Sequence, residues 1–227
     1  MHCPFKLVVF DFDGTLVDSQ WMIAQSMARA FEDQGLAAPA PAAVRRVVGL
    51  RLEMAAARLL PDPGDMDAAE RIADSYRKAS QALHARGEVH EPLFPGARAM
   101  LERLDQPHVS LGIATGKGRR GLLSSLERHG LSEFFVTLQT ADDGPGKPHP
   151  EILHRAMAEV GAGRAETVLI GDTTYDMEMA ANAGVRAVGV GWGYHGSEEL
   201  AASGAARVIE SFDDLPPCLA SLTRQST

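Results

Sequence analysis

Short apolar runs alternate with helical patterns along most of the chain. The apolar runs lie at residues 7–10, 109–115, 134–140, 167–172, 186–191 and 206–210. Between them, apolar residues recur every three or four positions, which is the spacing of amphipathic helices. Strands that alternate with helices form parallel sheets with helices on both faces. The pattern therefore predicts an α/β fold with a Rossmann-like three-layer α/β/α core.

The first apolar run is followed by a long segment with a helical pattern and no convincing strand. One amphipathic stripe ends near Gly35 and another near Gly87, with two short helices separated by Gly and Pro between them. This segment is predicted to be a small all-helical insert. We expect residues 1–16 and 94–227 to form the α/β core and residues 17–93 to form the insert.

Composition and charge narrow the possible functions. With 227 residues and 24.3 kDa, the chain is long enough for one full-sized core and a smaller unit. A formal charge of -8 argues against a nucleic-acid surface, so a phosphate site would need its own local cation. No apolar stretch approaches the roughly 20 residues of a membrane helix. Cys3 and Cys218 lack the spacing of a metal site or disulfide framework, which favours a cytoplasmic protein.

Polar residues stand where three predicted strands end. Asp11 and Asp13 close the first strand, Thr115 closes the second, and Asp172 closes the strand over 167–172. The carboxyl ends of parallel strands meet at one edge of a sheet, where ligands bind. A polar turn would explain any one of these positions, but it explains their coincidence poorly. We expect these side chains to form one site.

The two neighbouring acids suit phosphoryl transfer. Residues two apart on an extended chain point to the same side, so Asp11 and Asp13 can address one ligand. An ionised aspartate needs no base to attack, which makes Asp11 a plausible nucleophile. Asp13, protonated because of its charged neighbour and burial, could donate a proton to the leaving oxygen and later accept one from water.

The acids also suit magnesium, which prefers oxygen ligands and needs only one or two carboxylates from a protein. Asp11 and Asp172 are the predicted carboxylate ligands, and a backbone carbonyl near Asp13 is a third donor. Asp176, four residues after Asp172, is either a ligand through water or in the outer shell, or a solvated acid at a helix start. We expect Mg²⁺ as the cofactor.

Two lysines compete for the role of phosphate-binding cation. Lys147 follows a glycine turn and precedes two prolines that set a helix start, so its ammonium can project over the strand ends. Lys117 begins a basic helix, where a solvated side chain is the more common outcome. We therefore choose Lys147, and we assign Thr115 and the turn at Gly116 to the phosphate oxygens.

Arg51 is the first candidate in the insert for binding a distal charged group of a substrate, although a solvated helix face is the common alternative.

Residues 191–196, "GWGYHG", match a dinucleotide-binding glycine pattern, but too little chain follows them to complete such a domain. Their aromatic side chains are expected to pack against the insert or edge the site. Asp18 is assigned to a turn or a helix cap without a chemical role.

Four segments, "DFDGTLVDS", "GIATG", "GKPHP" and "IGDTTYD", resemble the four ordered motifs of the haloacid dehalogenase superfamily. The helical insert after the first motif resembles the cap of that superfamily. The resemblance implies that Asp11 is the nucleophile, Asp13 the general acid and base, Thr115 and Lys147 the phosphate binders, and Asp172 a magnesium ligand.

The resemblance also implies an activity. Asp13 favours attack on phosphorus, since the dehalogenase branch lacks an acid two residues after the nucleophile. The chain is most similar to phosphoglycolate-phosphatase-like enzymes, which hydrolyse small phosphomonoesters through an aspartyl-phosphate. A sugar-phosphate mutase, a pyrophosphatase and an inactive sensor of a phosphorylated metabolite are the alternatives. The expected partner is a small phosphorylated metabolite, with no nucleic acid and no membrane; the oligomeric state is left open.

Overall fold

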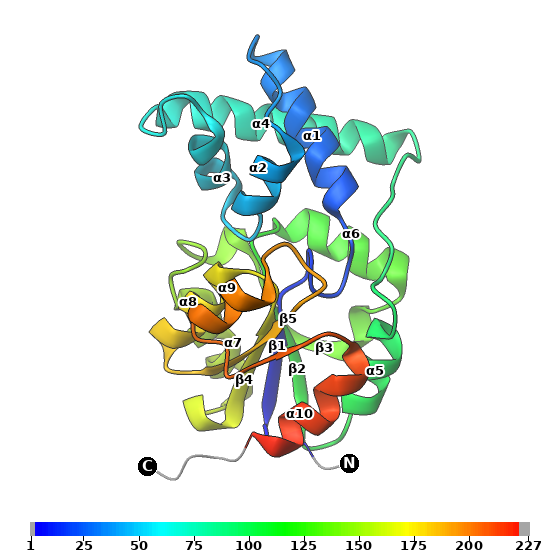
Figure 1. Cartoon of the computed structure of the whole chain (residues 1–227). Helices are drawn as coiled ribbons and strands as arrows, with labels where there is room; N and C mark the ends of the chain where they lie inside the picture. Colours follow the sequence, from blue (N-terminus) through cyan, green and yellow to red (C-terminus); the bar gives the residue numbers. More distant parts are fainter. Residues whose placement is uncertain (1–2, 223–227) are drawn as a thin grey trace.

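The computed structural model describes residues 3–222, and within them six strands form one sheet (Figure 1). The strand order is β3-β2-β1-β4-β5-β6, and every neighbouring pair is parallel. This confirms the predicted α/β class. The strands are β1 (Leu7–Phe10), β2 (Ser110–Ala114), β3 (Phe135–Gln139), β4 (Thr167–Gly171), β5 (Arg186–Val190) and β6 (Arg207–Ile209).

Helices cover both faces of the sheet, which confirms the three-layer core. The helices α5 (Ala97–Leu104), α6 (Arg119–His129) and α10 (Leu215–Ser221) pack on one face, and α7 (Glu151–Val160), α8 (Thr174–Ala183) and α9 (Ser197–Ala202) pack on the other. Successive residues of β1 alternate between the two hydrophobic clusters, as the two-residue period of a strand requires: Val8 and Phe10 join the first, and Leu7 and Val9 the second.

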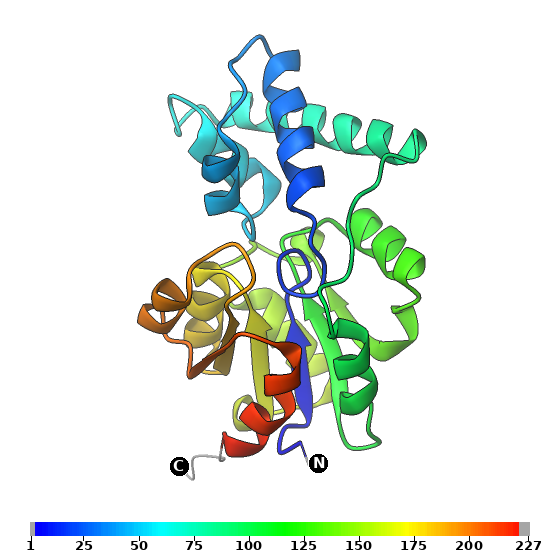
Figure 2. The same cartoon turned by 45° about the vertical axis from the view of Figure 1, so that its right-hand side comes forward.

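The segment between β1 and α5 is helical, as predicted, and lies beyond the carboxyl ends of the strands (Figures 1 and 2). It contains α1 (Gln20–Asp33), α2 (Pro41–Val47), α3 (Leu52–Leu59) and α4 (Met66–Ala85). These helices share a hydrophobic cluster of their own, which includes Met27, Phe31 and Ile72. We call residues 17–93 the insert.

The two connections between core and insert run side by side. The Asp18 amide donates to the Pro92 carbonyl over 2.8 Å, and the Phe94 amide donates to the Leu16 carbonyl over 3.0 Å. The bridge between Val17 and Leu93 lies between these bonds. The insert therefore leaves and rejoins the core at one place, at the carboxyl edge of the sheet.

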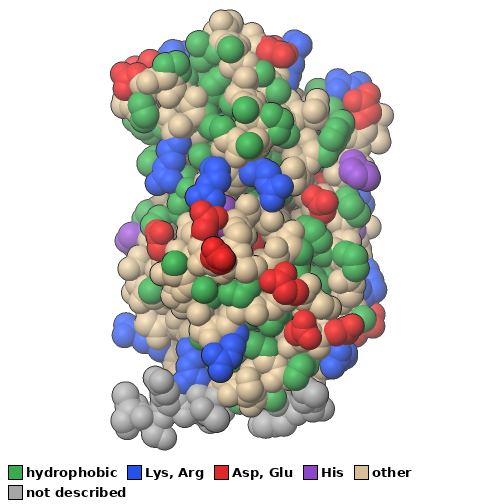
Figure 3. All heavy atoms as spheres, viewed as in Figure 1, with side chains coloured by type: hydrophobic (Ala, Val, Ile, Leu, Met, Phe, Trp, Pro, Cys, Tyr) green, Lys and Arg blue, Asp and Glu red, His purple; other side chains and the backbone are tan. Residues whose placement is uncertain are grey.

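Short 3₁₀ turns occur at Ser132–Phe134, Ala141–Asp143, Arg164–Glu166 and Phe212–Asp214. Across residues 3–222, none of the helices has the length and apolarity that crossing a bilayer requires. On the face shown in Figure 3, basic side chains gather where the insert meets the core.

Candidate active site

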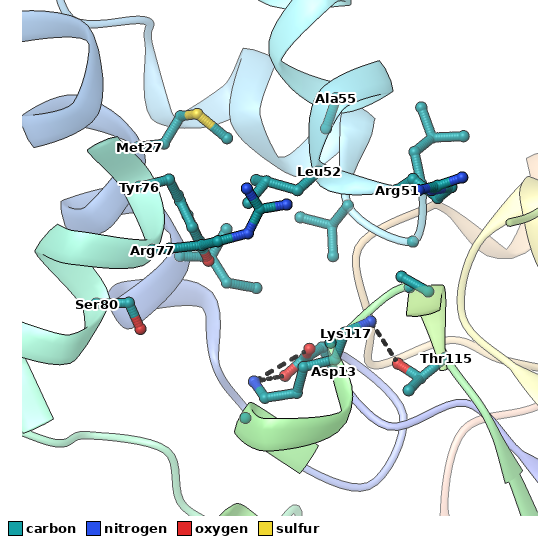
Figure 4. A pocket seen from close by; sticks show the side chains of 18 of the residues that line it. Asp13, Met27, Arg51, Leu52, Ala55, Tyr76, Arg77, Ser80, Thr115 and Lys117 are labelled. Atoms are coloured by element: carbon teal, nitrogen blue, oxygen red, sulfur yellow. Dashed lines mark hydrogen bonds and ion pairs between the residues drawn. The ribbon is translucent and has the colours of Figure 1, made fainter. Parts of the chain in front are cut away.

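The sheet edge and the insert enclose a cavity of about 650 Å³. Asp11, Asp13, Thr115 and Gly116 all line it, so the structure brings these predicted residues together at the ends of β1 and β2. The insert lines the opposite side, and Figure 4 shows side chains from both sides facing the same space.

Asp11 is held by a fully buried ion-pair cluster. The Lys147 ammonium lies 2.7 Å from Asp11 Oδ2 and 2.6 Å from Asp176 Oδ1, and none of the three side chains is more than 2% exposed. The Phe12 amide donates to Asp11 Oδ1 over 2.6 Å. Burial, only partly offset by Lys147, raises the pKa of Asp11 to about 7. The full burial of Asp176 excludes the solvated alternative for that residue.

Asp172 sits at the end of β4 with both oxygens occupied. The Thr15 hydroxyl donates to Oδ1 over 2.7 Å, and the Tyr194 amide donates to Oδ2 over 2.9 Å. Gly14 has a φ of +85°, and a Cβ there would lie 2.3 Å from Asp172 Oδ2, so this turn requires glycine. Burial, together with the charges of Asp11 and Asp176, raises the pKa of Asp172 well above its ordinary value.

These acids fit a divalent cation. Carboxylate oxygens of Asp11, Asp172 and Asp176 lie within 4.8 Å of one another, and all three side chains are buried. Lys147 pairs with two of these carboxylates, those of Asp11 and Asp176, so the three acids carry an excess of two negative charges over this ammonium when all are ionised. A buried excess of this kind is unfavourable unless a cation compensates it, and oxygen ligands of this type suit Mg²⁺.

Asp13 belongs to a second ion-pair cluster that sequence reasoning missed. The Lys117 ammonium lies 3.0 Å from Asp13 Oδ1 and 3.4 Å from Glu91 Oε1. The expectation of a solvated Lys117 is therefore wrong, since its side chain is only 17% exposed. Although burial favours the neutral acid, Lys117 and Arg128 hold the pKa of Glu91 below its ordinary value. The segment "ATGK" places Lys117 near the strand ends, but it gives no signal of the pairing with Asp13 and Glu91.

Thr115 and Gly116 form the turn after β2. Thr115 is buried, and its hydroxyl accepts a hydrogen bond from the Lys117 amide over 3.2 Å. A Cβ on Gly116 would lie 2.5 Å from the Gly49 carbonyl oxygen, so the insert approaches this turn too closely for a side chain. The predicted phosphate-binding turn is thus also a contact between core and insert.

Arg51 stands at the start of α3 and lines the cavity (Figure 4). Its Nη1 donates to the Gly144 carbonyl over 3.4 Å, and its Nε lies 3.9 Å from Glu53 Oε2. These contacts are long, and the side chain is 41% exposed.

Asp18 accepts a hydrogen bond from the Gln20 amide over 3.3 Å, which is a turn contact just before α1.

The insert is tied to the core next to the acid cluster. The Tyr175 hydroxyl accepts from Arg58 Nη1 over 2.6 Å and donates to the Arg46 carbonyl over 2.9 Å. The Tyr175 ring joins Val47 and Leu50 of the insert in a small hydrophobic cluster. Because Tyr175 directly precedes Asp176, this tie connects the position of the insert to the helix that carries one of the acids.

The aromatic residues of the "GWGYHG" segment pack beside the site. The Trp192 indole donates to the Thr15 carbonyl over 3.1 Å, and its ring packs 4.5 Å from that of Phe212. The Tyr194 hydroxyl lies 3.1 Å from the Ser19 hydroxyl, and the Arg45 guanidinium lies over the Tyr194 ring at 5.9 Å. The segment therefore edges the site and contacts the insert, as expected.

A parallel sheet with buried acids and a lysine at its carboxyl edge, under a helical insert, is an arrangement that suits phosphoryl transfer. The model of the haloacid dehalogenase-like hydrolases matches residues 8–190. The chain belongs to this family of hydrolases, which confirms the resemblance of its four motifs.

Similar proteins agree with this assignment. A probable phosphatase, IndB, of Dickeya dadantii is 34% identical over 92% of this chain and 91% of its own length. A phosphoglycolate phosphatase of Yersinia pestis is 30% identical over 93% of this chain and 92% of its own. The crystal structure of a putative haloacid dehalogenase-like hydrolase from Bacteroides fragilis superposes with a TM-score of 0.86 at 30% identity, covering 93% of this chain and 99% of that one.

Proposed function

We propose that the protein is a magnesium-dependent phosphatase that hydrolyses a small phosphomonoester through an aspartyl-phosphate on Asp11. The observation that carries the proposal is the buried cluster of Asp11, Lys147, Asp172 and Asp176, of which Asp11 lines the cavity. A carboxylate held beside an ammonium and a cation site can approach a phosphoryl group whose charge would otherwise repel it.

In the first step, an Asp11 oxygen attacks phosphorus and the bond from phosphorus to the leaving oxygen breaks. Asp13, which lines the same cavity, donates a proton to that oxygen, so that a neutral alcohol leaves. Lys147 compensates charge on the phosphoryl oxygens, and Thr115 with the turn at Gly116 supplies neighbouring donors.

In the second step, water attacks phosphorus and the bond from phosphorus to Asp11 breaks, which releases phosphate and restores the carboxylate. Asp13 accepts the proton of that water. In this structure Asp13 accepts hydrogen bonds from Lys117 at both oxygens, at 3.0 and 3.3 Å, which is the acceptor form that this step requires. The structure thus differs from the expectation of a protonated Asp13, and the first step requires Asp13 to gain a proton when the substrate binds.

Asp11, Asp172 and the backbone carbonyl of Asp13 would hold Mg²⁺, with Asp176 as a ligand through water or an outer-shell acid. When bound, the ion would offset negative charge on the transferring group. The binding geometry of the acids supports this assignment, since their oxygens lie within 4.8 Å of one another.

Residues 17–93 would act as the cap of the core formed by residues 1–16 and 94–227. The insert lines the cavity opposite Asp11 and joins the core through two adjacent connections, an arrangement that suits closure over a substrate. Closure would exclude water from the first step. Arg51, half-buried and weakly paired, would contact a distal charged group of the substrate.

The test is a panel of phosphoglycolate, sugar phosphates and pyrophosphate, assayed with Mg²⁺ and with EDTA. Asp11→Asn tests the nucleophile, and Asp18→Asn is a matched control in the same segment, because the side chain of Asp18 makes a turn contact away from the acid cluster. We expect metal-dependent release of phosphate that Asp11→Asn abolishes and Asp18→Asn retains. Metal-independent turnover, or activity that survives Asp11→Asn, would overturn the mechanism.

The same panel separates the alternatives. Preference for pyrophosphate would identify a pyrophosphatase. Transfer of phosphate within a sugar phosphate, without release, would identify a mutase. Binding without turnover by the intact chain would identify a sensor.

A further inference from the structure

The cavity extends well beyond the acids. Asp13, Thr115 and Lys117 mark its floor in Figure 4, while Met27 and Ser80 lie on the insert side, across the open space. All five line the same volume of about 650 Å³. A phosphoryl group bound at the floor therefore leaves most of this space to the leaving group.

The volume exceeds what a two-carbon leaving group needs. Even at water's full share of about 30 Å³ for each non-hydrogen atom, the whole of phosphoglycolate would take about 270 Å³. More than half of the cavity would stay filled with water. A leaving group of ring size would fill this remainder.

The space is bounded on the insert side by an apolar wall, which we define as Ile23, Met27, Leu52, Ala55 and Tyr76. These residues come from α1, α3 and α4, so the wall is built by the packing of three helices. In Figure 4 the labelled members of the wall face the cavity. Water against such a wall is displaced favourably by an apolar group, whereas a carboxylate would lose its hydration there.

Four cations line the cavity, Arg51, Arg77, Lys117 and Arg120, and two of them, Lys117 and Arg77, are engaged closely by acids. Lys117 pairs with Asp13 and Glu91. Arg77 pairs with Glu53 and Asp74. A small acid would have to compete with these carboxylates for either cation, while an apolar body would leave both pairs intact.

We infer that the cavity selects a phosphomonoester whose leaving group carries a ring-sized, largely apolar body, and that the apolar wall determines this specificity. The inference rests on the proposed function, since it places the phosphoryl group at Asp11. It assigns to α4 a part in recognition that the chemistry at the floor does not require.

The test compares 2-phenylethyl phosphate with ethyl phosphate and phosphoglycolate. The first two share an alkyl leaving oxygen and differ by the ring, so their ratio of kcat/KM reports the fit of the ring. We expect 2-phenylethyl phosphate to exceed both others by at least about tenfold, since even one methylene in an apolar pocket is worth roughly tenfold or more. Equal values for 2-phenylethyl and ethyl phosphate would overturn the inference.

Variants on α4 locate the effect. Ser80→Trp places a large ring in the cavity and should bring the ratio close to one, whereas Ala82→Trp, exposed on the same helix and outside the lining, should keep the wild-type ratio. Calorimetry with 2-phenylethylphosphonate, which cannot be hydrolysed, should show at least about tenfold weaker binding to Ser80→Trp, with thermal unfolding as the check on folding. Unchanged binding to Ser80→Trp would overturn the assignment.

Acetyl phosphate distinguishes this inference from the proposed function. It is small and activated, so its hydrolysis reports the chemistry at Asp11 and does not depend on contacts with the apolar wall. If neither acetyl phosphate nor any phosphate ester is turned over with Mg²⁺, the proposed function is refuted. Turnover of acetyl phosphate without a preference for the ring would refute the inference alone.

Discussion

Replacing Lys147 by methionine removes the ammonium that pairs with two of the three buried acids. The two side chains have similar length, so the change deletes the charge and leaves most of the volume filled. In the wild type the ammonium lies 2.7 Å from Asp11 and 2.6 Å from Asp176, with its side chain fully buried. The variant therefore leaves two carboxylates buried without their partner.

The expected loss follows from this geometry. Removing one partner of a buried ion pair destabilises a protein by about 3–5 kcal/mol, because the remaining charge is uncompensated. For a chain of this size each kcal/mol shifts the midpoint of thermal unfolding by roughly 2–4 °C, so we expect a fall of about 6–20 °C in EDTA. Mg²⁺ should reduce the deficit, since the variant no longer repels the ion with Lys147 and binds it more tightly.

The assay is urea and thermal unfolding of wild type and Lys147→Met, each in EDTA and in excess MgCl₂. Lys78→Met, at an exposed position on α4, is the matched control and should change the free energy of unfolding by less than about 0.5 kcal/mol. A deficit below about 1 kcal/mol in EDTA, or one that grows in Mg²⁺, would refute the reasoning about the charge of this cluster.

Three other changes test separate parts of the site. In EDTA, Asp11, whose buried carboxyl has its pKa raised to about 7, binds a proton more tightly when folded than unfolded. As the pH rises from about 4 to about 7, the free energy of unfolding should therefore fall, and it should fall less steeply in Asp11→Asn than in the wild type. Equal slopes for the two proteins, measured by thermal unfolding at each pH, would contradict this. Arg51→Ala should raise KM about tenfold for a substrate with a second anionic group and leave kcat nearly unchanged, and an unchanged KM would remove its role. Tyr175→Phe loses the hydroxyl contacts to Arg58 and Arg46, so KM should rise about fivefold, equivalent to ~1 kcal/mol; steady-state kinetics that match the wild type would show that this tie does not hold the insert.

The sheet could be predicted from sequence because its strands are buried on both faces. Such strands appear as short apolar runs with helices between them, and the resulting topology leaves few choices. The convergence of Asp11, Thr115 and Asp172 at one edge follows from the same topology. The helical character of the insert could also be predicted, because apolar residues recur there with helical spacing. Gly35 and Gly87 were predicted to end two of its helices, and the structure places both glycines in the left-handed region.

The partner of Asp13 could not be predicted in this way. Lys117 lies at the entrance to a basic helix, where sequence favours solvent. Its position depends on Glu91, which comes from the second connection between insert and core and is buried beside Arg128. Attraction by two buried carboxylates outweighs the tendency of a lysine to be solvated, and neither carboxylate is near Lys117 in sequence.

The cavity wall shows a second limit of prediction from the sequence. Residues 76, 80 and 84 lie four apart on α4, so the helical period alone places them on one face. Whether that face meets the core of the insert or the cavity depends on how α4 packs against α1 and α3. The stripe packs into the core of the insert at Ala69 and Ile72, and its continuation at Tyr76 and Ser80 lines the cavity. Sequence periodicity can define a face, but the partner that the face meets is set by tertiary packing. The proposed catalytic residues are therefore found in four short motifs, whereas the cavity wall depends on contacts between helices.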